Sequence, residues 1–471
     1  MGLAAQVGPD IVVTDLPDIL RWGSEGGYTA YSSATTSCNV GDLPAQWCEG
    51  VFPCPDVTRH PVISQDLYRL HRGRLEQIGM SWVKHGYWAN NLDGCGDCQE
   101  PKEFAVLLGV NCSDTYSSGF NGAQARLAPR AQVNPVTGDF PYPFDAPPVE
   151  NVLSRRLHVA DADLDRDANR GAKYFIAVQY IARDDAEAGN ALNNGAYRQI
   201  KVRRRNGVLE FVNASESIAA RSHPLMAWQE HDPAVELTAI DVPKDGRLIV
   251  AARVTALGNG RWHYEYAVHN VNSHRAVQSL SVPVDRTGRT FRVGFHDIDH
   301  HSGDGEGGQP YSGEDWQIVR GPAAVKWRSQ TYQENLNANA LRWGTTFNFW
   351  FDSDLPPARV RAGLALFRPG DPNGMSVEVP GPGLAGVAAC ENVRRASITC
   401  DELGRIAARV RLSDDSEDGR RIVFRTGDGA YFDALVRGTR ARGSACCFTS
   451  EQRVEWALPV NCRDPEDVWC P

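Results

Sequence analysis

A short segment that follows an alternating strand carries most of the potential ligands of this chain. Residues 290–316 begin with Phe291, Val293 and Phe295 on one face and continue into a loop rich in His, Asp, Glu and Gly. The candidate ligands are His296, Asp297, Asp299, His301 and Asp315. Imidazole with carboxylate binds transition metals, and carboxylates with loop carbonyls bind calcium. The loop therefore predicts a site for calcium or another divalent metal, or a catalytic acid–base pair. The alternative is structural, because His and Asp at strand ends often cap turns.

Alternating carboxylates in residues 161–169 form a second candidate cation site. This stretch places Asp161, Asp163, Asp165 and Asp167 before Asn169. A calcium loop of the EF-hand kind also needs a glycine at its sharp turn and a closing glutamate, and neither is present here. A solvated loop is therefore the simpler interpretation, with a partial surface calcium site as the alternative.

Sequence signatures of the common hydrolases are absent. The chain has no Gly-x-Ser-x-Gly elbow, no His-Glu-x-x-His motif and no glycine-rich phosphate loop. The adjacent carboxylates Asp184–Asp185 and Glu314–Asp315 are not ready glycosidase pairs, because neighbours on a strand face opposite ways. No catalytic residue is assigned from the sequence.

Cysteine placement is the strongest signal in the composition. The twelve cysteines form two sets of six, with none from 113 to 389: Cys38, Cys48, Cys54, Cys95, Cys98 and Cys112, then Cys390, Cys400, Cys446, Cys447, Cys462 and Cys470. Two even, separated sets predict two disulfide frameworks formed in an oxidising compartment, with the pairing left open. Zinc is the alternative for the first set, with Cys95, Cys98 and either Cys38 or Cys112 as ligands.

The elements that must position these residues are short strands, and helical periodicity is almost absent. Asn206–Gly207 lies between two apolar runs and predicts a hairpin, because this dipeptide tolerates the positive φ of a type I′ turn. Further on, Tyr264 and Tyr266 alternate with Glu265. We expect that strand to have one buried face and one wet face, as in an antiparallel sheet.

The predicted fold class is therefore all-β. Residues 1–148 are expected to form a loop-rich, disulfide-stapled β region that ends in a proline-punctuated linker. Residues 149–374 are expected to form a large cysteine-free antiparallel β-sandwich with a jelly-roll-like core. Residues 388–471 are expected to form a small, disulfide-rich immunoglobulin-like sandwich.

Charge and hydropathy argue against some classes of binding partner. The formal net charge is −9 and the pI is about 5.8, which argues against nucleic acid or an anionic membrane surface as the main partner. No apolar run is long enough to cross a bilayer, so no membrane insertion is expected. Residues 3–6 are similar to the small-residue end of a signal peptide, and we expect export.

Several stretches resemble a family of secreted, uncharacterised bacterial β-rich proteins. The matching stretches are TTSCN at 35–39, GMSWVKHG at 79–86, LGVNCSDTYSSGFNG at 108–122, GFHDID at 294–299 and NANALRWG at 337–344. They spread over most of residues 10–370. The resemblance implies export and a short cysteine-flanked sandwich at about residues 400–462, and it implies no particular activity.

Together these features favour an exported protein with a structural or binding role outside the cytoplasm. It could be a subunit of a surface coat or filament that self-associates or binds a carbohydrate or surface partner. The alternative is a secreted, carbohydrate-active hydrolase that uses the loop from His296 to Asp315.

Overall fold

The computed structural model describes most of the chain, and antiparallel strands dominate it. It describes residues 7–49, 54, 56–103, 105–258, 261–285, 288–321, 323–383, 393–400, 406–416, 421–426, 431–445, 453–457 and 468–469. Strands account for 48% of the residues and helices for 7%, which confirms the all-β fold class. Among the described residues, no helix combines the length and the apolar character needed to span a bilayer.

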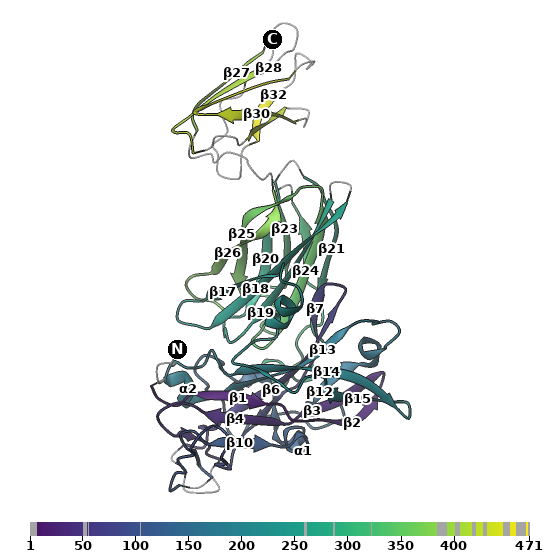
Figure 1. Cartoon of the computed structure of the whole chain (residues 1–471), viewed down its shortest axis with the longest axis vertical. Helices are drawn as coiled ribbons and strands as arrows, with labels where there is room; N and C mark the ends of the chain where they lie inside the picture. Colours follow the sequence, from purple (N-terminus) through teal and green to yellow (C-terminus); the bar gives the residue numbers. More distant parts are fainter. Residues whose placement is uncertain are drawn as a thin grey trace.

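The first body is a large sheet that nearly closes into a barrel (Figure 1). Its strands follow the order β15-β14-β13-β6-β7-β12-β3-β2, and β15 also lies beside β2. The strands are β2 (Ile19–Glu25), β3 (Tyr28–Ser33), β6 (Val62–His71), β7 (Arg74–Met80), β12 (Leu157–Ala160), β13 (Lys173–Ile181), β14 (Gly195–Arg205) and β15 (Val208–Asn213), with β8 (Val83–His85), β11 (Leu127–Ala128) and β16 (Ala219–Ala220) beside them. The predicted hairpin joins β14 to β15, and Asn206 and Gly207 both have positive φ.

The division expected at residue 148 does not coincide with a break in this sheet. Strand β13 pairs with β6 along its whole length, from Lys173 opposite Leu70 to Ile181 opposite Val62. Strand β12 inserts between β3 and β7. Residues from both sides of position 148 therefore share one hydrogen-bonded sheet and one apolar core. After this sheet the chain forms α3 (Leu225–His231), whose buried side chains belong to a separate apolar cluster.

The second body is a sandwich of two five-stranded sheets and stands on the first body in Figure 1. One sheet has the order β17-β18-β19-β24-β21 and the other β22-β23-β20-β25-β26. Their bounds are β17 (Glu236–Asp241), β18 (Arg247–Gly258), β19 (Arg261–Asn270), β20 (Val277–Pro283), β21 (Thr290–His296), β22 (Gln317–Arg320), β23 (Ala324–Arg328), β24 (Thr346–Ser353), β25 (Pro357–Leu366) and β26 (Gly374–Pro382). Aromatic side chains such as Tyr266, Trp327 and Phe349 fill the space between the sheets. An antiparallel sandwich is therefore present, but its strands span residues 236–382 and not the expected 149–374.

The outer face of β19 is buried from Glu265 onward, contrary to the expectation, whereas Arg261 is exposed and His263 half-buried. Glu265 is only 3% exposed, because the β6–β7 hairpin of the first body packs on it. Arg74 of that hairpin donates two hydrogen bonds to the Glu265 carboxylate, at 2.8 and 2.6 Å. The Tyr68 hydroxyl lies 3.1 Å from Thr346 Oγ1. A polar face can be buried in this way because each charged group finds a partner in the other body.

Three disulfides staple the first body, as predicted for the first set of cysteines. Cys38 bonds Cys95, Cys48 bonds Cys54, and Cys98 bonds Cys112. The zinc alternative is wrong, because Cys95 and Cys98 bond different partners and neither is a thiolate. Disulfides of this number are typical of extracytoplasmic proteins. They lie around two small sheets, made of β1 (Ile11–Asp15), β4 (Thr35–Asn39) and β10 (Ser113–Tyr116), and of β5 (Ala45–Gln46) and β9 (Leu107–Leu108).

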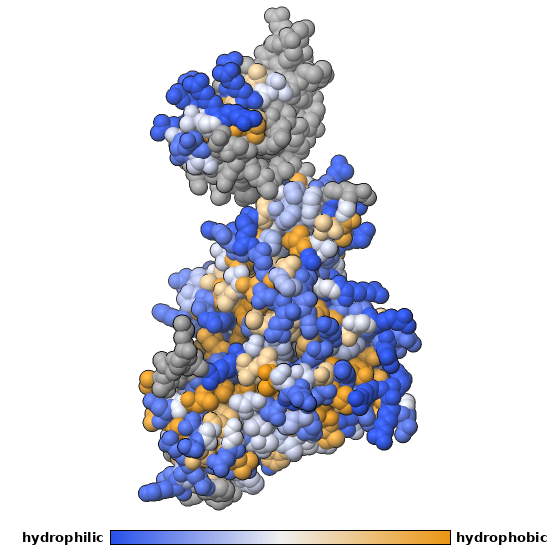
Figure 2. Space-filling model, viewed as in Figure 1, coloured by the Kyte–Doolittle hydropathy of each residue, from blue (hydrophilic) through white to orange (hydrophobic). Residues whose placement is uncertain are grey.

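Helices are short and serve as connections. They are α1 (Ser118–Asn121), α2 (Arg183–Glu187), α3, and the 3₁₀ turns η1 (Gln124–Arg126), η2 (Arg130–Gln132), η3 (Asp161–Leu164) and η4 (Glu306–Gly308). Figure 2 shows hydrophilic residues over most of the visible face of the two bodies, with smaller hydrophobic patches among them.

The C-terminal part is also β. Its described strands form an antiparallel sheet with the order β27-β28-β31-β30-β29-β32-β33. They are β27 (Val393–Cys400), β28 (Ile406–Leu412), β29 (Arg421–Thr426), β30 (Tyr431–Arg437), β31 (Arg440–Ala445), β32 (Arg453–Ala457) and β33 (Val468–Trp469). Of the second cysteine set, Cys390, Cys446, Cys447, Cys462 and Cys470 lie outside the described residues, and only the backbone of Cys400 is described. Their predicted pairing stays a prediction.

Candidate functional site

The five predicted ligands in the loop after β21 do not act as one set. Asp297 accepts a hydrogen bond from the side-chain amide of Asn339, and Asp299 accepts one from the Tyr28 hydroxyl at 3.0 Å. Burial raises the pKa of the Asp297 carboxyl, which the Asn339 hydrogen bond partly offsets. These two aspartates therefore face different neighbours.

The other three predicted ligands are also separate. Nδ1 of His301 lies 3.1 Å from Nδ1 of His158, and its Nε2 lies 3.0 Å from the Met80 carbonyl oxygen. His296 has a buried Nε2 without a hydrogen-bond partner in the described part of the chain. Asp315 lines a separate polar groove. Among the described residues, no three His, Cys, Asp or Glu side chains gather closely enough to hold a metal ion.

The carboxylates of residues 161–169 are engaged in turns and ion pairs. Asp163 pairs with Arg69 at 2.8 Å. Asp165 accepts the backbone N–H groups of Asp167 and Ala168, both at 2.9 Å. These bonds lower the pKa of the Asp165 carboxyl, as expected for a carboxylate that caps a turn.

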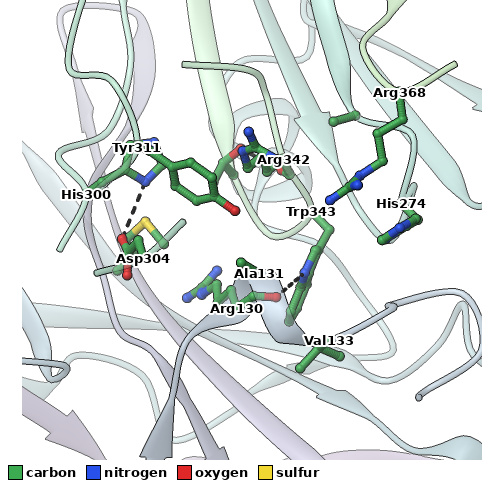
Figure 3. Close-up of a pocket in the computed structure, with 13 residues that line it drawn as sticks. Arg130, Ala131, Val133, His274, His300, Asp304, Tyr311, Arg342, Trp343 and Arg368 are labelled. Atoms are coloured by element: carbon green, nitrogen blue, oxygen red, sulfur yellow. Dashed lines mark hydrogen bonds and ion pairs between the residues drawn. The ribbon is translucent and has the colours of Figure 1, made fainter. Parts of the chain in front are cut away.

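The loop after β21 instead contributes to a pocket between the two bodies, shown in Figure 3. It supplies His300, Asp304 and Tyr311. Four further cationic or imidazole side chains also line it: Arg130 from η2, His274, Arg342 and Arg368. The space measures about 460 Å³, part of it open to solvent. Only about 30 Å³ of it can hold the centres of water-sized molecules, so it suits a small anion or one polar group of a larger molecule.

Arg342 is the unusual charge in this pocket. Arg130 pairs with Asp66 at 2.9 Å and Arg368 pairs with Glu306, whereas Arg342 has no such ion pair among the described residues. Arg342 is only 8% exposed, and burial lowers the pKa of its guanidinium, which still remains charged. Within the described residues the pocket therefore holds a buried positive charge that has no ion pair of its own, and Glu306, the partner of Arg368, acts on it only electrostatically.

The hydrogen bonds of Arg342 do not use all the N–H donors of its guanidinium. Nη2 donates to the carbonyl oxygens of Leu336 and Ala338, at 2.9 and 3.2 Å. Nε has no hydrogen-bond partner within the described residues. The guanidinium carbon lies 3.9 Å from the centre of the Tyr311 ring, so a cation–π contact stabilises part of the charge. Donor capacity thus remains for a ligand.

Tyr311 and His300 add further hydrogen-bonding groups to the pocket. Burial raises the pKa of Tyr311 to about 12, so its hydroxyl keeps its proton, and Figure 3 shows it pointing into the pocket. Nδ1 of His300 lies 3.5 Å from Oδ2 of Asp304, while its Nε2 is buried without a partner in the described chain. The Asp304 carboxylate is already used by Trp82 Nε1 and the His301 backbone N–H. Such a lining favours an anion or another acceptor-rich group.

A tight turn places Arg342 and Trp343 in the pocket. Gly344 has φ of +73°, and its N–H donates to the Asn270 carbonyl at 2.7 Å. A Cβ at this position would lie 2.5 Å from Arg130 Nη1. Glycine is therefore required both for the left-handed backbone and for the close approach of Arg130. The Trp343 indole N–H donates to the Arg130 carbonyl at 3.2 Å and joins the turn to η2.

Sequence reasoning missed most of this pocket. His300, Asp304 and the arginines are not among the residues that the sequence pattern predicts as ligands. Arg342 and Trp343 lie in the segment NANALRWG, which carried the family resemblance without a role. That segment was the available signal, because it places a charged residue beside a tryptophan in an otherwise uncharged stretch.

Comparison with known proteins adds little. No family model and no curated protein matches the chain. Among solved structures, the chain is similar to the N-terminal periplasmic domain of ScsB from Proteus mirabilis at 7% sequence identity, covering 50% of this chain and 98% of that one, with a TM-score of 0.14. That score is too low to support any argument about fold or function.

Proposed function

We propose that this is a secreted or cell-surface binding protein that holds an anionic group in the pocket around Arg342. The observation that carries the proposal is the buried guanidinium of Arg342, which has no ion pair in the part of the chain that the structure describes. Leaving such a charge unpaired costs several kcal/mol, and a bound anion offsets that cost. The three disulfides support an extracytoplasmic place of action. A binding role is compatible with the resemblance to a family of secreted bacterial proteins. In this role the protein would be a component of a surface coat or filament that attaches to an acidic carbohydrate or another acidic surface.

Added sulfate, phosphate or galacturonate is expected to raise the melting temperature of the protein, while chloride at equal ionic strength does not. A ligand that binds only the folded state stabilises it in proportion to its saturation. Arg342→Gln is expected to weaken binding of the best of these anions at least tenfold, since hydrogen bonds to charged groups contribute about 1.5–3 kcal/mol. Titration calorimetry measures both affinities.

Arg361→Gln on β25 is the matched control, because its side chain is 72% exposed and lies outside the pocket. Without ligand, Arg342→Gln is expected to change the free energy of unfolding by less than about 2 kcal/mol, because the lost hydrogen bonds are offset by removal of a buried charge. Equal anion affinity in the parent protein and in Arg342→Gln would refute the proposal.

A secreted carbohydrate-active hydrolase remains the second candidate function. The specific observation in its favour is the raised pKa of the buried Asp297 carboxyl, with the Asp315 carboxylate contributing to the rise. Asp315 and Glu314 line an open polar groove of about 1000 Å³. A carboxyl whose pKa is raised by burial and by a second carboxylate is a candidate general acid.

If the protein is a hydrolase of this kind, Asp297→Asn and Asp315→Asn are each expected to lower turnover of a polysaccharide substrate at least a hundredfold. Anion binding at Arg342 should stay unchanged in both variants. A screen of plant and bacterial polysaccharides for released reducing ends measures the activity. Absence of any release by the parent protein leaves the binding function as the sole candidate.

A further inference from the structure

The outer face of the C-terminal sheet carries one arginine from each of four adjacent strands. Strands β27, β28, β31 and β30 neighbour one another in that order, in the uppermost sheet of Figure 1. Arg395 of β27 lies opposite Arg411 of β28. Arg411 lies opposite Arg440 of β31, which lies opposite Arg437 of β30. Directly opposed residues of an antiparallel sheet share a face, so these four arginines form a row across the sheet.

A second, shorter row lies beside the first. Arg409 of β28 lies opposite Arg442 of β31, and each is two residues from a member of the first row. Residues two apart on a strand share a face, and the residues between them, Val410 and Ala441, are buried. The arginines themselves are exposed, and Figure 2 shows strongly hydrophilic residues on the described part of this sheet. This surface is named the arginine face, and its members are Arg395, Arg409, Arg411, Arg437, Arg440 and Arg442.

The charges of the arginine face have no acidic partner in the part of the chain that the structure describes. Among the described residues, no ion pair involves a position after Glu378. Asp414, in the segment after β28, accepts hydrogen bonds from the hydroxyl and the backbone N–H of Ser416. These bonds lower the pKa of the Asp414 carboxyl, and the arginine that adds to the effect is Arg394, which is not part of the face. The positive charge of the face is therefore not compensated by any described carboxylate.

Placing arginines directly opposite one another is unfavourable for the sheet itself. Neighbouring strands lie only about 4.8 Å apart, and like charges at opposed positions destabilise an antiparallel pair. The arrangement does not reflect a generally basic chain, because the formal net charge is −9. A partner that carries closely spaced negative charges removes the repulsion when it binds. Charge complementarity therefore indicates an anionic partner for this face.

The type of cation and its spacing specify the chemistry of that partner further. Every basic residue after Lys326 is an arginine. A guanidinium binds a sulfate or a carboxylate through two parallel N–H···O bonds, whereas an ammonium acts as a point charge. The row of four arginines is about 14 Å long, because it crosses three strand spacings of about 4.8 Å. Such a row matches an extended chain with several anionic groups and not a single small anion.

We propose that the arginine face binds a linear acidic polysaccharide, whose sulfate or carboxylate groups pair with successive guanidinium groups along the row of four. A polysaccharide is favoured over a nucleic acid because no described side chain of this face is aromatic, and the bases of single strands stack on aromatic rings. The three disulfides, which are typical of extracytoplasmic proteins, favour the same class of partner. This inference does not depend on the function proposed for the pocket around Arg342, which takes a single anionic group.

Dextran sulfate, polygalacturonate and neutral dextran of similar length test the assignment by titration calorimetry with the full chain. At least one acidic polymer is expected to bind, the tighter one identifying sulfate or carboxylate as the preferred group, and neutral dextran is not. Arg411→Gln/Arg440→Gln removes the centre of the row. It is expected to weaken binding at least about tenfold and to reduce the slope of log K against log salt concentration by about 2. Absence of binding by both acidic polymers at low salt overturns the proposal.

Arg203→Gln/Arg205→Gln is the matched control, because both side chains are exposed on β14 and the variant removes the same charge. It is expected to bind the polymers as tightly as the parent protein, as is Arg342→Gln. Arg411→Gln/Arg440→Gln should keep the parent melting temperature and the sulfate-dependent shift assigned to Arg342, which shows that it is folded and separates the two proposals. Equal weakening by the two double variants would show general charge attraction and contradict the assignment. Tighter binding of duplex DNA than of either polysaccharide, lost in Arg411→Gln/Arg440→Gln, would assign the face to nucleic acid and overturn the proposal.

Discussion

A His60→Phe/His85→Phe double variant is expected to gain at least roughly 3 kcal/mol of stability relative to the parent protein when the pH falls from 7 to 4. Both histidines are buried, at 1% exposure each. Burial lowers the pKa of His60 from 6.5 to about 4, and it lowers the pKa of His85 well below its usual value. The unfolded chain therefore binds protons at a pH where the folded chain cannot.

The hydrogen bonds define the neutral state of this pair. His60 Nδ1 contacts the Cys48 carbonyl oxygen, which only accepts, so that nitrogen carries the proton. Its Nε2 then accepts from Nδ1 of His85 at 2.7 Å. The Nε2 of His85 has no hydrogen-bond partner among the described residues. The rings that surround the pair are Tyr87, Phe140, Tyr142 and Phe144. Protonation would place a positive charge among these aromatic rings and near Lys84. The electrostatic effect of Lys84 also lowers both pKa values.

The sign of the effect follows from the depressed pKa values. Each histidine contributes its full stability above pH 6.5 and loses it as the pH falls through that value toward the folded-state pKa. For His60, the interval from 6.5 to about 4 corresponds to roughly 3 kcal/mol, and His85 acts in the same direction. Phenylalanine has no proton to bind, so the double variant lacks this loss.

Urea unfolding of both proteins at pH 7, 5.5 and 4 measures the difference. The quantity to compare is the difference in unfolding free energy between the variant and the parent protein at each pH. The buried carboxyls of Asp66 and Asp185 have raised pKa values, so they stabilise the folded state as the pH falls, opposite to the histidines. Both proteins contain these carboxyls, so their effect cancels in the difference. At pH 7 the double variant is expected to be the less stable one, since it loses the bond to Cys48. Parallel pH dependence in the two proteins would contradict the expectation.

Arg130→Met is expected to lower the free energy of unfolding by about 3–5 kcal/mol, because it leaves the Asp66 carboxylate buried without its partner. Arg130 is 5% exposed and reaches four acceptors in both bodies. Nε donates to Ser81 O at 2.7 Å, Nη1 to Gly344 O at 3.4 Å, and Nη2 to Gln65 O and Asp66 Oδ1. Removal of this side chain therefore eliminates hydrogen bonds that join the two bodies, as well as the ion pair.

A second substitution separates these contributions. Adding Asp66→Asn to Arg130→Met is expected to recover a large part of the lost stability, since it removes the unpaired charge. The asparagine keeps an acceptor for the Gln77 amide, which lies 2.8 Å from Asp66 Oδ1 in the parent protein. Burial already raises the pKa of Asp66 to about 6, and Arg130 opposes that rise. Arg130→Met alone should therefore be less destabilised at pH 5 than at pH 8.

Urea titration at both pH values measures these differences. Arg359→Met is the control, because the Arg359–Glu236 pair is exposed and should contribute less than about 1 kcal/mol. A loss for Arg130→Met as small as that of the control would show that the buried pair does not join the bodies.

Local features of the sequence predicted local features of the fold. Asn206 and Gly207 define a hairpin without help from elsewhere, because their backbone preference matches the turn. The even number of cysteines before residue 113 predicted disulfides, although not their partners. Alternation in β19 correctly gave the core face, with Tyr264 and Tyr266 buried, since side chains on a strand point to opposite faces by geometry.

What the sequence alone determined about this protein is its class: a mostly β chain, stapled by disulfides and suited to an oxidising compartment. Only the tertiary structure decided which strands share a sheet, why Glu265 is buried, and where the pockets lie. The pocket around Arg342 joins residues more than two hundred positions apart, and its defining property is the absence of a counter-ion among the described residues. Composition, periodicity and spacing report on neighbours along the chain. The partner that a buried charge finds, or lacks, depends on long-range packing of two bodies.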